Sequence, residues 1–319
     1  MMNKLSETQF AEAFGTTVDD LPTACRELIA RTDFGYHILE NSQKDEVILD
    51  VLRRIESDQQ KIAAEGRRNV WENGWAENLQ AFEASGHDLN TIVPKFIRPG
   101  QVVRLNHQYV KPTNPTFELD YLNVFCQWLF PKYLTDATDI YEFGCGTGMN
   151  LVTIARLFPD KRLYGLDFVP SAVALVNRIG TVYGWNITGQ LFDMMKPDEG
   201  FAMAKNSVVL TIGSIEQLAG KFEKFLQFLL SRSPALCISV EPTIELYDDE
   251  NLLDYLAIKF HRKRGYSENY LSRLRKLESE GRVEIIKAKR LQFGSKYMEG
   301  YSCLIWRPLS ITTPRGVKA

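Results

Sequence analysis

Three alternating glycines stand behind an acidic residue in the stretch Tyr-Glu-Phe-Gly-Cys-Gly-Thr-Gly-Met-Asn-Leu, residues 141–151. Apolar residues flank the stretch on both sides, so the pattern predicts a strand, a tight turn and a helix. Gly144, Gly146 and Gly148 let the backbone turn sharply and let a ligand approach closely. Such a turn lies at the carboxyl end of a strand and at the start of a helix, where α/β sheets bind ligands. The sequence therefore predicts a ligand site at this turn.

The glycine spacing argues against two common phosphate-binding loops. A dinucleotide-binding turn has the pattern G-x-G-x-x-G, but here the third glycine comes one residue early and Met149 stands where the pattern needs glycine. A Walker loop needs a following Gly-Lys-Ser/Thr, which is absent. Glu142 would also repel a pyrophosphate. A ligand that carries positive charge would suit this carboxylate better.

Two more acidic residues follow predicted strands. Asp167 ends the apolar strand predicted at 162–167, and Asp193 follows the strand predicted at about 186–192. The carboxyl ends of neighbouring parallel strands meet at one edge of a sheet, so a carboxylate at Asp167 can accept both hydroxyls of a ribose. A helix cap or a turn is the alternative role for such an acid.

The stretch from Glu142 to Gly148 resembles motif I of the class I S-adenosylmethionine-dependent methyltransferases, E/D-x-G-x-G-x-G. The resemblance covers about residues 121–308, and only the glycine turn is specific. It implies methyltransferase activity with S-adenosyl-L-methionine as cofactor. It also implies that Glu142 lies near the positively charged end of the cofactor, that Asp167 binds the ribose, and that Asp193 contacts the adenine amino group between apolar side chains. The cofactor-binding residues expected on this basis are Glu142, Gly144, Cys145, Gly146, Gly148, Asn150, Asp167, Phe168, Asp193, Met194 and Gly213.

Candidate residues for binding or deprotonating the methyl acceptor follow the later strands. Glu216 comes after the strand predicted at 207–212, and Glu241 ends the strand predicted at 235–240. Either could bind the acceptor or remove its proton. The alternative for Glu216 is that it is simply an exposed residue at the start of a helix. His107 is added because it lies near Tyr109 in a proline-rich stretch. The predicted catalytic residues are therefore Glu216, Glu241 and His107.

Basic residues supply candidates for binding the acceptor. Residues 259–264 read Lys-Phe-His-Arg-Lys-Arg, and such runs usually form solvated helix faces. Recognition of a carboxylate or phosphate is the alternative. The predicted substrate-binding residues are Arg104, Tyr109, His261 and Arg264.

Several acceptor chemistries lack their sequence signatures. The Asn/Asp-Pro-Pro-Tyr/Phe signature is absent, and no Pro-Cys pair follows the fourth strand, so methylation of nucleobases is disfavoured. The acidic residues 248–250 form no recognisable metal-ligand set, and no metal is predicted. We expect O-methylation of a small metabolite or sugar-like acceptor, with an anionic acceptor as one option. Methylation of a protein or peptide side chain, or a non-catalytic protein that binds S-adenosylmethionine, are the alternatives.

Composition limits the possible partners. The chain has 319 residues, 45% hydrophobic and 24% charged, with a net charge of −2, so general attraction to nucleic acid is not indicated. No apolar run approaches the roughly 20 residues needed to span a bilayer, and no signal peptide is recognised. The five cysteines have irregular spacing and form no Cys-x-x-Cys pair. Reduced thiols in the cytoplasm are the simplest interpretation.

The elements that must position these residues alternate between strand and helix from about residue 116. This alternation predicts a doubly wound, mostly parallel sheet of seven strands with an antiparallel final strand. We assign residues 116–319 to this domain, with a helical insertion at about 243–281, and expect a helix at 217–230. Residues 1–115 lack the alternation and are predicted to form an N-terminal helical cap, with helices at 46–55 and 68–84 and an ordered linker or lid at 93–115.

Overall fold

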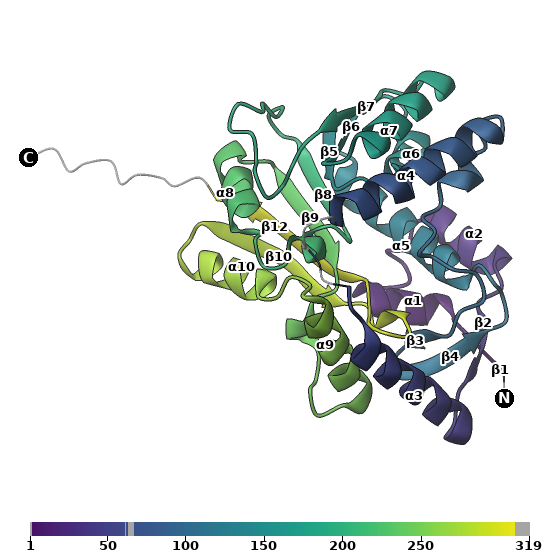
Figure 1. Ribbon diagram of the computed structural model, residues 1–319. Coiled ribbons are helices and arrows are strands. Elements are labelled where there is room, and N and C mark those ends of the chain that lie inside the picture. The colour runs from purple at the N-terminus through teal and green to yellow at the C-terminus, as the bar shows by residue number, and fades with distance from the viewer. Residues whose placement is uncertain (1, 61, 63–66, 310–319) are drawn as a thin grey trace, which may run out of the picture.

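The structure is a computed structural model that describes residues 2–60, 62 and 67–309, and two β-sheets organise it (Figure 1). The larger sheet has seven strands in the order β10-β12-β9-β8-β5-β6-β7, and only β12 runs antiparallel to its neighbours. This confirms the predicted doubly wound sheet and its antiparallel final strand. The strands are β5 (Asp139–Phe143), β6 (Arg162–Asp167), β7 (Ile187–Leu191), β8 (Val208–Ile212), β9 (Leu236–Glu241), β10 (Val283–Arg290) and β12 (Ser302–Pro308).

Helices cover both faces of this sheet because its strands are apolar on both sides. Along β5, Ile140 packs into one core, whereas Tyr141 and Phe143 pack into the other. The first core includes α5 (Phe117–Leu134), α6 (Met149–Leu157) and α7 (Pro170–Tyr183), and the second includes α8 (Glu223–Arg232) and α10 (Tyr270–Ser279). No helix within the described ranges has both the length and the hydropathy to cross a membrane.

The helix expected at 217–230 was wrong in its bounds. A short 3-10 helix, η2 (Ile215–Leu218), ends where Ala219 and Gly220 take φ values of 50° and 75°. The chain then turns into α8. Two consecutive left-handed residues cannot continue a right-handed helix. The break leaves Glu216 in η2, directly after the end of β8, instead of on a long helix.

The N-terminal region contains a second sheet, which sequence analysis missed. Its antiparallel strands, in spatial order, are β1 (Met2–Lys4), β2 (Gly35–Ile38), β4 (Gln108–Pro112), β3 (Val103–Leu105) and β11 (Phe293–Ser295). The prediction of a linker or lid at 93–115 is therefore corrected: Val103, Leu105 and Val110 are buried in a hairpin. Asn106 and His107 form its two-residue turn, with φ values of 48° and 60°. Strand β11 comes from the C-terminal half, so the N-terminal segment is built into the larger domain.

The remaining helices lie mostly around the second sheet and the insertion. Helix α3 was expected at 46–55 and α4 at 68–84, and both form. The insertion expected at 243–281 contains η3, α9 and α10. The bounds are α1 (Glu7–Phe14), α2 (Thr23–Arg31), α3 (Asn41–Ser57), α4 (Arg67–Ala84), η1 (Leu89–Ile92), η3 (Ile244–Leu246) and α9 (Leu252–Arg264).

Helix α4 runs beside α7, across the larger domain (Figure 1). Near one end, the hydroxyl of Ser171 donates to the carbonyl of Glu72 at 2.9 Å, and the amide of Ser171 donates to the Glu72 carboxylate at 3.2 Å. Near the other end, Arg178 pairs with Glu83 at 2.7 Å. These contacts fix the N-terminal segment over the carboxyl end of β6.

A buried network of four charged side chains joins the two sheets and the insertion. Arg104 of β3 donates to Asp254 of α9 at 2.5 Å and lies 3.4 Å from Glu299. Arg290, at the end of β10, pairs with Asp254 and with Glu299, both at 2.6 Å. Because two cations meet two carboxylates, the charges balance inside the protein.

Replacing Asp254 with alanine should lower the free energy of unfolding by about 3–5 kcal/mol, because two buried guanidinium groups lose their shared carboxylate. Chemical denaturation measures the change. Asp249→Ala, at an exposed position in the segment just before α9, is the control and should change the free energy of unfolding by less than about 0.5 kcal/mol. Equal stabilities of the two variants would contradict a structural role for the network.

Candidate functional site

The glycine turn follows β5 and has a backbone that only glycine adopts readily. Gly144, Gly146 and Gly148 have φ values of 73°, 52° and 76°, all in the left-handed region. The amides of Gly144 and Cys145 donate to the carbonyl of Leu166 at 2.7 and 3.1 Å, which ties the turn to β6. Gly148 is the N-cap of α6, so free amides of the helix start lie next to the turn.

Neighbouring elements approach the turn too closely for any side chain at these positions. A Cβ atom at Gly144 would lie 2.4 Å from the Cβ of Ser214, which follows β8. A Cβ at Gly146 would lie 3.0 Å from a ring carbon of Trp75 on α4. The turn is thus enclosed by the segment after β8 on one side and by the N-terminal region on the other.

Asp167, at the end of β6, holds the middle of the turn. Its two carboxylate oxygens accept the amides of Gly146 at 3.0 Å and of Val169 at 3.2 Å. The side chain is buried, and this burial raises the pKa of Asp167 to about 6. Each oxygen has a second lone pair, so the carboxylate can still accept a ligand hydroxyl.

Glu142 lies inside the sheet on β5, the strand next to the one that ends at Asp167. Its Oε1 accepts the side-chain amide of Asn150 at 2.6 Å, whereas its buried Oε2 has no hydrogen-bond partner among the described residues. Burial raises the pKa of Glu142 to about 8. A buried carboxyl oxygen without a partner is energetically unfavourable, and a ligand donor or cation would satisfy it.

The other expected cofactor residues differ in their exposure. Phe168 is half-buried and packs with Trp75 and Val169, and the Met194 methyl group lies 3.4 Å from the Cβ position of Gly144. Asp193 is exposed, and its carboxylate accepts the amide of Met195 at 2.8 Å. Gly213 is exposed with a φ of 64°, so the strand end beside the turn remains open there. Cys145 is buried, and burial raises its thiol pKa well above the ordinary value.

Glu241, at the end of β9, organises the segment after β8. Its carboxylate accepts the backbone amides of Ser214 at 3.1 Å, of Ile215 at 3.0 Å and of Glu216 at 3.3 Å. Burial raises the pKa of Glu241 to about 7, although these amides favour the ionised form. Because its lone pairs face the backbone, Glu241 is placed to position Glu216.

Glu216 is the acid with a free oxygen on this side of the turn. Its Oε1 accepts the side-chain amide of Gln217 at 2.7 Å, and its buried Oε2 has no partner among the described residues. Burial, followed by the nearby charge of Glu241, raises the pKa of Glu216 to about 8. A carboxylate of this basicity can take a proton from a bound hydroxyl.

Three of the predicted residues lie in or beside the buried network instead of at the turn. Arg104 is fully buried, and its guanidinium is bound to Asp254 and Glu299, so the structure gives it a role in stability. Its strand neighbour Tyr109 is also buried and packs against α3 and α9. The Nδ1 of His107 lies 3.9 Å from Asp254, at the edge of the same network. The structure does not bring this group to the glycine turn.

The two predicted residues of the basic run have different surroundings. His261 is fully buried, its Nε2 lies 2.9 Å from the carbonyl of Ser267, and burial lowers its pKa to about 4. It therefore acts as a neutral structural residue. Arg264 pairs with Asp58 at 2.7 Å and interacts electrostatically with Glu216.

Sequence analysis missed the part of the site that α4 supplies. Trp75 covers Gly146 and stacks on Trp71, with ring centroids 5.3 Å apart. Arg68 donates to the carbonyl of Phe168 at 3.1 Å. The two tryptophans are spaced i, i+4 and therefore share one face of α4.

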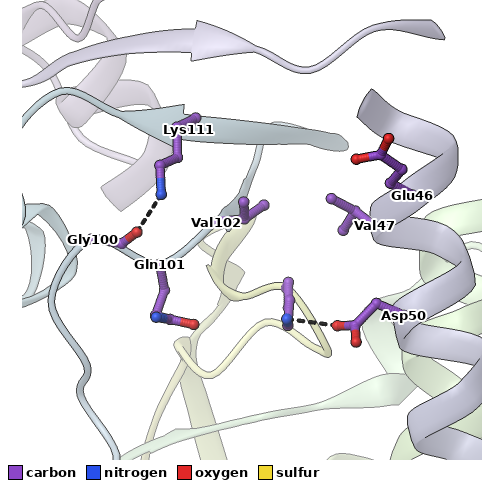
Figure 2. A pocket seen from close by; sticks show the side chains of 8 residues that line it. Glu46, Val47, Asp50, Gly100, Gln101, Val102 and Lys111 are labelled. Carbon is purple, nitrogen blue, oxygen red and sulfur yellow. Dashed lines mark hydrogen bonds and ion pairs between the residues drawn. The ribbon is translucent and has the colours of Figure 1, made fainter. Parts of the chain in front are cut away.

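Figure 2 shows a separate cleft of about 260 Å³ between α3 and the segment before β3. Two of its charged side chains pair with each other, Lys296 with Asp50 at 2.6 Å, and Lys111 donates to the backbone carbonyl of Gly100 at 2.5 Å. No residue of the glycine turn lines the cleft. Among the described residues, no group of three or more histidine, cysteine or acidic side chains is arranged to hold a metal ion.

Comparisons with known proteins extend this description. No protein-family model matches the chain, and no curated protein is significantly similar to it in sequence. Among solved structures, the cyclase SpnF matches with a TM-score of 0.51 at 10% identity, over 78% of this chain and 98% of that chain. Human N-acetylserotonin methyltransferase, solved with S-adenosylmethionine, matches with a TM-score of 0.46 at 13% identity, over 93% and 73% of the two chains. PigF, solved with S-adenosylhomocysteine, has a TM-score of 0.42 at 14% identity and 59% of each chain.

At these identities a structural likeness defines the fold and not the reaction, and the match to SpnF has a TM-score above 0.5. It extends over nearly the whole of SpnF and over 78% of this chain. In this chain, the single antiparallel strand and the glycine turn after the central strand belong to the doubly wound sheet that the sequence predicts. The chain has the fold of the class I S-adenosylmethionine-dependent methyltransferases.

Proposed function

We propose that this protein is an S-adenosyl-L-methionine-dependent methyltransferase that methylates a hydroxyl oxygen of a small metabolite or sugar-like acceptor. The main support is the placement of Glu142 and Asp167. They end two adjacent parallel strands beside the glycine turn, and the Gly146 amide bonds directly to Asp167. A pyrophosphate would meet two buried acids there, whereas a ribose and a positively charged group would find acceptors.

Several features of the site suit this cofactor. The glycine turn brings bare backbone and the amides of a helix start to the ligand, and the unpartnered Oε2 of Glu142 offers an acceptor to a charged amino group. Phe168 and Met194 supply apolar surface for a ring, and exposed Asp193 can accept from an amino group at its edge. The cofactor would supply a methyl group bound to a positively charged sulfur.

The residues of the chain would then perform three tasks. Asp167 and the turn hold the donor, α4 excludes water through Trp75, and Glu241 positions the backbone that carries Glu216. Held by Asp167 and the turn, the cofactor would supply its methyl group to the acceptor oxygen and would leave as the neutral sulfide. The hydroxyl proton passes to Glu216, whose carboxyl pKa of about 8 suits this transfer near neutral pH.

The alternatives differ in the acceptor and in activity. A protein or peptide side chain could replace the small acceptor, or the protein could bind the cofactor without catalysis. The small acceptor is favoured because α4 and Trp75 leave the turn enclosed instead of open to a large partner. All five cysteines are free and buried, so we propose the cytoplasm as the compartment.

Asp167→Ala should weaken the binding of S-adenosylhomocysteine by about 1–3 kcal/mol, because the ribose hydroxyls lose their charged acceptor. Isothermal titration calorimetry measures the dissociation constant. Asp160→Ala, an exposed acid on the amino-end side of β6, is the control and should bind as the wild type does. If both variants bind with the wild-type constant, Asp167 is not in the cofactor site.

Incubation with methyl-labelled S-adenosylmethionine should transfer label to a molecule in a small-metabolite extract. The expected product resists mild alkali and hydroxylamine, as an ether does and an ester does not. Glu216→Gln should reduce the rate by about 100-fold or more, because a positioned base contributes 10²–10⁴-fold. Label in protein alone would favour the protein-methylating alternative, and binding without any labelled product would favour the non-catalytic one.

A further inference from the structure

Five charged or polar side chains from different parts of the chain meet beside the glycine turn. They are Arg67 at the start of α4, Glu216 of η2, Arg264 at the end of α9, Tyr266 just after it, and Asp58 just after α3. Arg67 interacts electrostatically with Glu216, Arg264, Tyr266 and Asp58. The amide of Ile62 donates to the carbonyl of Arg264 at 2.9 Å, which holds the segment after α3 against the end of α9.

This group faces the turn from both of its sides. On one side, Ser214 abuts Gly144, and Glu216 follows two residues later. On the other side, Trp75 covers Gly146, Trp71 stacks on Trp75, and the Arg67 guanidinium lies 4.9 Å from the Trp71 ring centre. Arg67 and Glu216 are therefore the outer ends of two chains of contacts that both begin at the turn.

The group has unused binding capacity. The Nε of Arg67 and the Oε2 of Glu216 are buried without hydrogen-bond partners, and no ion pair within 4 Å joins these two residues in the described part of the chain. Asp58 is already paired with Arg264 at 2.7 Å and with Arg54 at 3.4 Å. Asp58 thus occupies Arg264, whereas Arg67 has no ion pair within 4 Å among the described residues, so its guanidinium is left to bind an anion.

We propose that Arg67 and Arg264 bind an anionic group of the methyl acceptor, and that Glu216 receives the hydroxyl next to it. This proposal rests on the proposed function and narrows its substrate class to a hydroxylated acid, with a carboxylate, sulfate or phosphate group. The planar guanidinium groups match the oxygens of such anions in two-bond geometry. Stacking on Trp71 orients Arg67, and the bond of Arg264 to the Tyr266 hydroxyl at 3.2 Å orients the second guanidinium.

The surroundings explain why Arg264 is chosen from the basic run. Arg262, two residues earlier, is exposed and pairs with Glu268 on the surface at 3.3 Å. Arg264, in contrast, turns inward toward Asp58 and Glu216. Arg262 therefore serves as a control for the loss of an arginine outside the group.

The test uses sulfate as the probe, titrated at pH 9 into the full chain saturated with S-adenosylhomocysteine. Sulfate keeps its charge throughout the working range, and Glu216 is mostly ionised at this pH because its pKa is about 8. Arg67→Gln should weaken sulfate binding by about tenfold, because one charge-assisted contact is lost. Arg262→Gln should leave it unchanged. Glu216→Gln should strengthen it several-fold, since a carboxylate next to the anion is removed.

The proposal predicts that Arg67→Gln and Glu216→Gln change the sulfate affinity in opposite directions. Equal sulfate affinity in the wild type, Arg67→Gln and Glu216→Gln would overturn the proposal, as would weaker binding in both variants. Absence of S-adenosylhomocysteine binding would contradict the proposed function separately. The sulfate series can still be measured on the free protein in that case, so the two failures remain distinguishable. Circular dichroism of each variant confirms that the fold is intact.

Discussion

The bond between the Gly146 amide and the Asp167 carboxylate is the contact on which the proposed cofactor site depends. It joins the turn after β5 to the end of β6, and it forms because a residue with a positive φ turns its amide toward the neighbouring strand. A side chain at Gly146 would meet Trp75, so the same glycine also lets α4 close over the turn. One residue without a Cβ atom therefore brings together a ligand-binding carboxylate, a bare backbone and an aromatic cover.

The sequence was sufficient for the larger sheet because its signals are local. Apolar runs end in glycine or an acid, and each is followed by a helical pattern, so the bounds of β6 were predicted to the residue. The second sheet gave no such signal. Its strands have three to five residues, and β11 comes from almost two hundred residues beyond β3, so only the fold could show that they pair. Short strands separated this far in the chain have no periodicity to detect.

The same distinction explains the site residues. Glu142 and Asp167 could be placed because strand ends of a parallel sheet share an edge. Arg104 was assigned to the acceptor because an arginine looks alike in sequence whether a ligand or a buried carboxylate neutralises it, and the sequence does not show that His261 is buried as a neutral side chain. Asp254 and Glu299, which neutralise Arg104, lie about 150 and 195 residues away. Trp75 is buried, and the surface it packs against is the glycine turn, which its place in a predicted helix at 68–84 does not reveal.

The donor side and the acceptor side of the proposed site are built from different parts of the chain. The donor side is built from consecutive strand ends, which any chain of this fold can supply. The acceptor side is assembled from α4, η2 and the end of α9, and the Arg264–Asp58 pair and the network around Asp254 both help to bring these segments together. Two arginines near the turn would repel each other and the positively charged donor. Asp58, Glu216 and Glu142 offset that repulsion, and Arg67, which has no ion pair among the described residues, is left to bind an acidic acceptor.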